Sequence, residues 1–135
     1  METHFLADLV DGEPEFKREP WYNPYGDCVV FLAANEATYA DRVDEVLTLY
    51  RAQKDDRAVG FQIKGVQAII DQFGLRGVQI GAEGEGRELV SVRMLLLVAL
   101  RQAREPLTHH RLQAYDDILC QVSQDAVRIP LTSQV

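Results

Sequence analysis

Two pairs of residues near the C-terminus carry the side chains that most often bind metal ions. The pair His109-His110 precedes the pair Asp116-Asp117, and imidazole nitrogens with carboxylate oxygens suit several divalent metals. On a helix, His110 and Asp117 share a face, but seven residues separate them by about 10 Å along the axis. The chain has only 3 histidines. We therefore expect no metal site and no cofactor.

A glycine-rich segment, residues 81–86, precedes a predicted helix and has the composition of a phosphate-binding loop. A Walker loop needs Gly-Lys followed by Ser or Thr at the helix start, and a dinucleotide loop needs Gly-x-Gly-x-x-Gly after a strand. Neither pattern is present, and the carboxylates of Glu83 and Glu85 would repel a phosphate. We interpret the segment as a solvated loop.

Acidic residues in the first half of the chain could act as a paired general acid and base. The pair Asp55-Asp56 is typical of a turn, because aspartate bonds to the backbone of its own turn. The segment Asp41-Arg42-Val43-Asp44 has no matched nucleophile or second acid, which favours a solvated loop. The chain also lacks Gly-x-Ser-x-Gly, His-Glu-x-x-His and kinase motifs. We assign no catalytic residue, and the sequence does not favour an enzyme.

Aromatic residues cluster between positions 21 and 25 and suggest a different kind of site. Ligand pockets are mostly apolar with a few placed polar groups. A small molecule could bind between these aromatic rings and a sheet, with Asp27 or Asp41 as the polar group. The alternative is that the rings hold the N-terminal arm against the body of the protein. The candidate ligand-binding residues are Trp21, Tyr22, Tyr25, Asp27 and Asp41.

These candidates belong to a chain of 135 residues, which is long enough for one domain with its own core. Its 47% hydrophobic and 26% charged residues are typical of a soluble globular protein. The longest apolar run, Met94 to Leu100, is far shorter than the roughly 20 residues that span a membrane. We expect no membrane partner.

The N-terminus and the cysteines predict a cytoplasmic protein of a bacterium-like cell. Residues 1–8 lack the basic and apolar regions of a secretory signal. Cys28 and Cys120 are predicted to be reduced thiols, because nothing in the sequence points to an oxidising compartment.

The net charge of −7 argues against nucleic-acid binding, which depends on lysine and arginine. The charge is uneven: residues 1–27 hold seven acids and two bases, whereas residues 28–135 hold fourteen acids and twelve bases. We predict an acidic N-terminal arm over residues 1–27 and a single domain over residues 28–135. The apolar residues of the arm have the spacing of a short helix that docks on the domain: Phe5, Leu6, Leu9 and Val10.

A continuous apolar run predicts a buried strand over residues 28–33. The segment Asn23-Pro24-Tyr25-Gly26 predicts a turn before it, with proline at the first central position and Gly26 supplying a positive φ.

Residues 36–52 permit two interpretations. Four residues recur at helical spacing: Ala40, Val43, Leu47 and Tyr50. Residues 46–52 also have the composition of a strand, and residues 58–64 alternate apolar and other residues as a second strand does. A turn at residues 53–57 would join the two into a hairpin. We favour the hairpin.

The second half of the chain is predicted to be mainly helical. Three helices are indicated by apolar spacing, over residues 66–73, 88–104 and 109–122, with Thr108 as the N-cap of the last. Short strands are predicted at residues 77–81 and 126–131. The last two helices could form a helix-turn-helix, but Arg111 is the only firm base between residues 108 and 124, so we do not expect DNA binding.

The fold class predicted from these elements is α+β. An antiparallel sheet of three to four strands, about 28–33, 46–52 and 58–64, packs against the three helices.

The predicted helix 88–104 is apolar on two sides, which suits a helix that is either central in the fold or shared with a partner. Twofold contacts are the commonest in soluble oligomers, so we expect a homodimer or another protein partner. The candidate interface residues are Val90, Arg93, Met94, Leu97, Val98 and Arg101.

Residues 22–65 resemble a small uncharacterised bacterial domain family. The likeness rests on the segment Tyr22-Asn23-Pro24-Tyr25-Gly26-Asp27 before an apolar strand, and on Val59-Gly60-Phe61-Gln62-Ile63 after a hairpin. Residues 35–44 are an insert relative to that family. The resemblance implies an antiparallel sheet and no catalytic residues. Because such domains are sometimes encoded beside toxin-like proteins, it also implies an antitoxin-like partner of a basic toxin as an alternative function.

Overall fold

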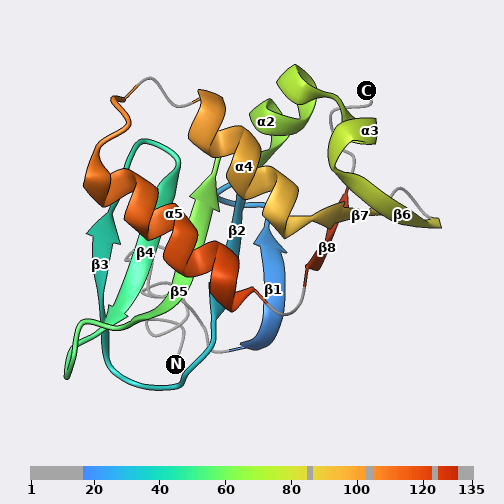
Figure 1. The fold of residues 1–135 in the computed structure, drawn as a ribbon. Coiled ribbons are helices and arrows are strands. Elements are labelled where there is room, and N and C mark those ends of the chain that lie inside the picture. Colours follow the sequence, from blue (N-terminus) through green and yellow to red (C-terminus); the bar gives the residue numbers. More distant parts are fainter. Residues whose placement is uncertain (1–16, 85–86, 103–104, 123–124, 131–135) are drawn as a thin grey trace.

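A computed structural model describes residues 17–84, 87–102, 105–122 and 125–130 (Figure 1). The predicted α+β class is confirmed. The strands are β1 (Lys17–Asn23), β2 (Cys28–Leu32), β3 (Thr38–Arg42), β4 (Leu47–Ala52), β5 (Ala58–Lys64), β6 (Gln79–Gly84), β7 (Arg87–Ser91) and β8 (Ala126–Pro130). The helices are α2 (Val66–Phe73), α3 (Leu75–Val78), α4 (Val92–Gln102) and α5 (His109–Gln121).

The larger sheet is antiparallel and has the strand order β1-β2-β5-β4-β3. Helices α4 and α5 cross one face of it (Figure 1), and the main hydrophobic core lies between this face and the helices. Alternation along the strands directs one set of side chains into that core. The set includes Val29, Phe31, Leu47, Leu49, Phe61 and Ile63.

The predicted hairpin is confirmed, and the helical interpretation of residues 36–52 is wrong. Strands β4 and β5 pair in antiparallel register, and a tight turn joins them. In that turn the Arg57 backbone N–H donates to Asp55 Oδ1 at 3.1 Å, and Asp56 has a φ of 63°. Aspartate tolerates this left-handed conformation better than most residues, which explains the pair of aspartates.

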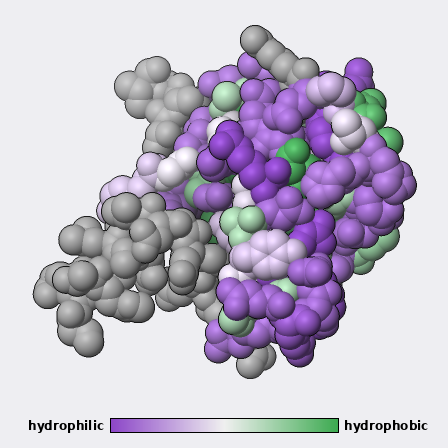
Figure 2. Space-filling view, turned by 90° about the vertical axis from the view of Figure 1, so that its left-hand side faces the viewer, coloured by the Kyte–Doolittle hydropathy of each residue, from purple (hydrophilic) through white to green (hydrophobic). Residues whose placement is uncertain are grey.

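The predicted number of strands is too small. Strand β3 includes Asp41 and Arg42, the first half of the segment interpreted as a solvated loop. An exposed edge strand needs no apolar alternation, so the sequence pattern did not indicate it. Charged side chains surround it, with ion pairs from Arg51 to Asp41 at 2.8 Å and from Arg57 to Glu36 at 2.8 Å. Figure 2 shows that this side of the molecule is mostly hydrophilic, as expected of an edge that avoids pairing with another sheet.

A second antiparallel sheet, with the order β6-β7-β8, was not predicted. The predicted helix 88–104 is wrong at its start, because residues 87–91 form β7. Helix α4 begins only after Ser91, whose Oγ accepts from the Met94 backbone N–H at 3.1 Å. The predicted end of this helix, residues 103–104, lies outside the described residues.

The remaining sequence predictions agree more closely with the structure. Helix α2 has the predicted bounds, and Thr108 caps α5 by accepting from the Arg111 backbone N–H at 3.2 Å. The predicted edge strand near the C-terminus is β8, at one side of the second sheet. The glycine-rich loop is wrong for residues 81–84, which belong to β6, and residues 85–86 lie outside the described residues.

The N-terminal region is described only from residue 17 onward. Its last part is β1, which pairs with β2 at the edge of the larger sheet. The turn predicted over residues 23–26 is found one residue later, at residues 24–27, and the positive φ belongs to Asp27 (51°) and not to Gly26. Cys28 is buried, Cys120 is exposed, and both are free thiols.

Candidate functional site

Tyr22 and Asp27, two of the predicted ligand-binding residues, are brought together by the structure. The Tyr22 hydroxyl donates to Asp27 Oδ1 at 2.6 Å. The Asp27 carboxylate also accepts from the Gln67 backbone N–H, at 3.1 and 3.2 Å, and so caps the first turn of α2. Burial and the bond to Asp27 raise the pKa of Tyr22 to about 12. The carboxylate therefore already has partners within the fold.

The other predicted ligand-binding residues lie elsewhere. Trp21 is on the opposite face of β1 from Tyr22, because neighbouring residues of a strand point to opposite faces. Tyr25 is 84% exposed at the turn. Asp41 is on β3, at the other edge of the sheet, roughly 19 Å from β1 at about 4.8 Å per strand. These residues are not brought into one pocket with Tyr22 and Asp27.

His110 and Asp117 are also separated. His110 Nε2 lies 3.5 Å from Asp41 Oδ1, whereas Asp117 accepts from the Gln113 amide at 2.8 Å. Within the described residues, no group of three or more His, Cys, Asp or Glu side chains is arranged to hold a metal ion. No described helix is both long and apolar enough to cross a membrane.

The predicted interface residues divide into buried and exposed groups. Val90 on β7 and Val98 on α4 are buried, at 0% and 3% exposure. Arg93 is exposed but held at the end of α5, where its guanidinium bonds to the Val122 carbonyl. Met94, Leu97 and Arg101 remain on the outer side of α4.

These outer residues form one wall of an open apolar groove of about 550 Å³, which we call the α4 groove. Phe73, at the end of α2, forms the other wall. Phe73 and Leu97 are each 42% exposed, although both are large apolar side chains. The complete lining is Phe73, Met94, Leu97, Val98, Leu100 and Arg101.

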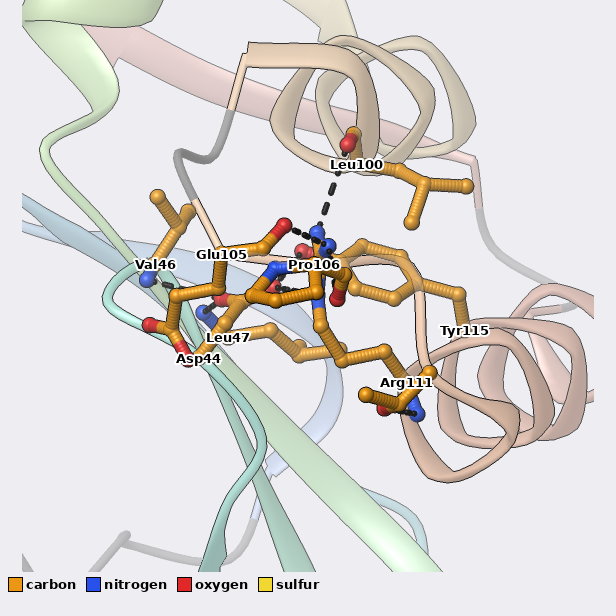
Figure 3. A network of polar contacts seen from close by, with 9 residues as sticks. Asp44, Val46, Leu47, Leu100, Glu105, Pro106, Arg111 and Tyr115 are labelled. Atoms are coloured by element: carbon orange, nitrogen blue, oxygen red, sulfur yellow. Dashed lines mark hydrogen bonds and ion pairs between the residues drawn. The ribbon is translucent and has the colours of Figure 1, made fainter.

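A buried polar network lies where the β3–β4 turn meets α5 and the connection between α4 and α5 (Figure 3). Asp44, in the turn between β3 and β4, accepts at Oδ2 from Arg111 Nε at 3.0 Å and from the Tyr115 hydroxyl at 2.8 Å. The side chains of Asp44 and Arg111 are 0% and 3% exposed. The sequence interpretation of Asp44 as part of a solvated loop is therefore wrong.

Every part of this network has a partner. Asp44 Oδ1 accepts from the backbone N–H groups of Val46 at 2.9 Å and Leu47 at 2.7 Å. The remaining nitrogens of Arg111 donate to backbone carbonyls: Glu105 at 2.7 Å, Pro106 at 3.0 Å and Leu100 at 3.3 Å.

The buried network therefore ties the β3–β4 turn to the connection between α4 and α5. Burial and the bond to Asp44 raise the pKa of the Tyr115 hydroxyl far above its usual value. A carboxylate whose oxygens are all bonded and which solvent does not reach has no free site for a substrate. Its role is structural. Two sequence features belong to this network: the four-residue spacing of Arg111 and Tyr115, and an aspartate three residues before a strand. Neither feature indicates that the two segments contact each other.

Comparison with family models, with curated proteins and with solved structures gives no significant match to this chain. The α4 groove is accordingly judged on its geometry.

Proposed function

We propose that this protein acts by association, with a second copy of itself as the partner, through the α4 groove. The observation that carries the proposal is the joint exposure of Phe73 and Leu97 at 42% each, on two helices that line one groove. Contiguous exposed apolar side chains on a folded domain mark interaction surfaces more often than isolated ones do.

The groove has the chemistry that a twofold contact requires. In such a contact both copies present the same surface, so the surface must complement itself. The lining is apolar except for Arg101 on α4, so each copy presents an apolar surface bordered by one guanidinium.

The apolar centre supplies the driving force for this contact. Full burial of a leucine or phenylalanine side chain contributes about 1.5–3 kcal/mol. Each copy would bury the exposed parts of Phe73 and Leu97, so one contact removes four such surfaces from water.

Light scattering after size-exclusion chromatography tests the proposal over a range of concentrations. We expect the full chain to show twice the monomer mass of 15.3 kDa, and Leu97→Glu to show the monomer mass. The matched control is Leu112→Glu on α5, because Leu112 is similarly exposed at 47% but lies outside the groove. A wild-type mass of one chain at every concentration contradicts the proposal.

A substitution on the other wall identifies the contact itself. Phe73→Asp, on α2, should also give the monomer mass. A dimer mass retained by Phe73→Asp would mean that the dimer uses another surface.

A further inference from the structure

The ring of Phe73 lies directly against the backbone of Gly77, four residues further along the chain. A Cβ atom placed on Gly77 would be 2.4 Å from Phe73 Cε2 and 2.8 Å from Phe73 Cδ2. Carbon atoms in favourable contact are about 3.5–4.0 Å apart. Any side chain at position 77 would therefore displace the ring, and glycine leaves the ring where it is.

The backbone conformation does not itself require glycine at position 77. Gly77 lies inside α3 and is not among the glycines with positive φ, so other residues can adopt its conformation. Gly74 differs, because its φ of 98° ends α2 directly after Phe73. The Gly77 backbone N–H donates to the Gly74 carbonyl at 3.1 Å, which fixes this turn. The close approach of the Phe73 ring is thus the physical reason for glycine at position 77.

Phe73 has a special place in the α4 groove, because all other residues of the lining belong to α4. Within the described residues, Phe73 is the only side chain that α2 contributes to the lining. Moving its ring to an ordinary contact distance from a Cβ at position 77 would shift this wall by about 1 Å. Protein interfaces are packed as closely as protein interiors, so a shift of this size spoils the fit of a partner.

We propose that Gly77 is the positioning residue of the α4 groove and holds the Phe73 ring where a second copy of the chain can pack against it. This inference rests on the proposed dimer and adds the residue that controls one wall of its interface. Gly77 does not line the groove, so it acts through Phe73. A larger residue at position 77 should therefore weaken the dimer without weakening the fold.

Gly77→Ala tests the proposal through two quantities that should change differently. The dissociation constant of the dimer, from a dilution series in analytical ultracentrifugation, should rise about tenfold, because a twofold contact contains the displaced ring twice. The urea midpoint, measured at concentrations that give monomer, should stay the same or rise, because alanine favours a helix more than glycine does. A residue with only a structural role would lower the midpoint and leave the association of folded molecules unchanged.

Gly81→Ala, on β6, is the matched control. A Cβ on Gly81 would lie 3.7 Å from Leu89 Cδ1, which is an ordinary contact, and Gly81 does not line the groove. Its dissociation constant should equal that of the wild type.

The role of the ring is tested in a Phe73→Leu background, in which the ring atoms next to Gly77 are absent. Gly77→Ala should have little further effect on the dissociation constant there, because the two residues act through one contact.

The outcomes separate this proposal from the proposed dimer. An unchanged dissociation constant in Gly77→Ala, with a dimeric wild type, would overturn the role of Gly77 and leave the dimer intact. A lower urea midpoint or a failure to fold would also overturn it, since Gly77 would then be a residue of the fold. The same holds for an equal loss of association with and without the Phe73 ring. A wild type that is monomeric at every concentration would contradict the dimer itself and, with it, the role of Gly77.

Discussion

The buried Asp44–Arg111–Tyr115 network and the α4 groove meet near the end of α4, and their side chains differ in how far water reaches them. In the network, every charged and polar atom has a partner, and the side chains are closed to water. In the groove, two large apolar side chains stay partly in water. Leu100 belongs to both, since its carbonyl accepts from Arg111 and its side chain lines the groove.

This difference suggests that the network stabilises the fold and that the groove is available for binding. A polar group that is fully paired inside the fold has no remaining capacity for a ligand, whereas an apolar group left partly exposed gains free energy only when something covers it. The charged cluster therefore maintains the fold, although charge is the usual sign of a functional site. The groove, which has almost no polar chemistry, is the better candidate for function.

The largest effect on stability is expected from a substitution at Arg111. Arg111→Met leaves the Asp44 carboxylate buried without its cation, and losing one partner of a buried pair costs about 3–5 kcal/mol. We expect this loss in the free energy of unfolding measured in urea. The control is Arg51→Met, because the Arg51–Asp41 pair is partly exposed, at 17% and 20%, and should cost about 1 kcal/mol or less.

A second variant checks the cause of this loss. Arg111→Met leaves the Asp44 carboxylate without a counter-charge, and Asp44→Asn removes that carboxylate. The double variant should therefore lose less unfolding free energy than the sum of the two single variants. Additive losses would mean that the two side chains do not form one network in solution.

Alkaline pH is the next way to weaken the network, and the effect is smaller. Tyr115 and Tyr22 have raised pKa values in the folded chain, to about 12 for Tyr22, while the unfolded value is near 10. The unfolded chain therefore loses tyrosine protons first as the pH rises. Their contribution to stability is complete below about pH 10 and is lost progressively above it, as the pH rises through the folded pKa values.

Urea unfolding on both sides of pH 10 measures this slope. Tyr115→Phe should make the decline of stability with pH shallower, because the variant has one fewer proton to lose on unfolding. Tyr25→Phe, which changes a side chain that is 84% exposed, should show the same decline of stability with pH as the wild type. Equal slopes for all three proteins would show that Tyr115 is not protected by the network.

Local chemistry explains what the sequence could predict. The turn at Asp55-Asp56 and the Thr108 cap depend on residues within a few positions of each other, so the hairpin and the start of α5 were predictable. Strand β7 was not, because Leu89 and Val90 fit a helical stripe as well as a strand, and only Ser91 marks the true start of α4.

The network and the candidate site could not be predicted, because both depend on contacts between residues far apart in the sequence. Asp44 and Arg111 are 67 positions apart, and no local pattern links them. Helix periodicity did select Met94, Leu97 and Arg101 for the outer side of α4, but it also selected Val90, which is buried in β7. Phe73 completes the groove from another helix, so only the packing of α2 against α4 reveals it.

The smallest change in stability is expected from a substitution in the groove. Leu97→Ser removes an apolar side chain that is already 42% exposed, and surface changes of this kind usually alter the free energy of unfolding by about 0.5 kcal/mol or less. At protein concentrations low enough to give monomer, Leu97→Ser should therefore unfold in urea like the wild type. Leu96→Ser, at the fully buried neighbouring position, should instead lose several kcal/mol, as core truncations do. If both serine variants lost stability equally as monomers, Leu97 would be a core residue and the groove would not be a surface kept for a partner. If Leu97→Ser lost stability only at concentrations where the wild type is dimeric, that loss would come from the contact between copies, because association stabilises by mass action.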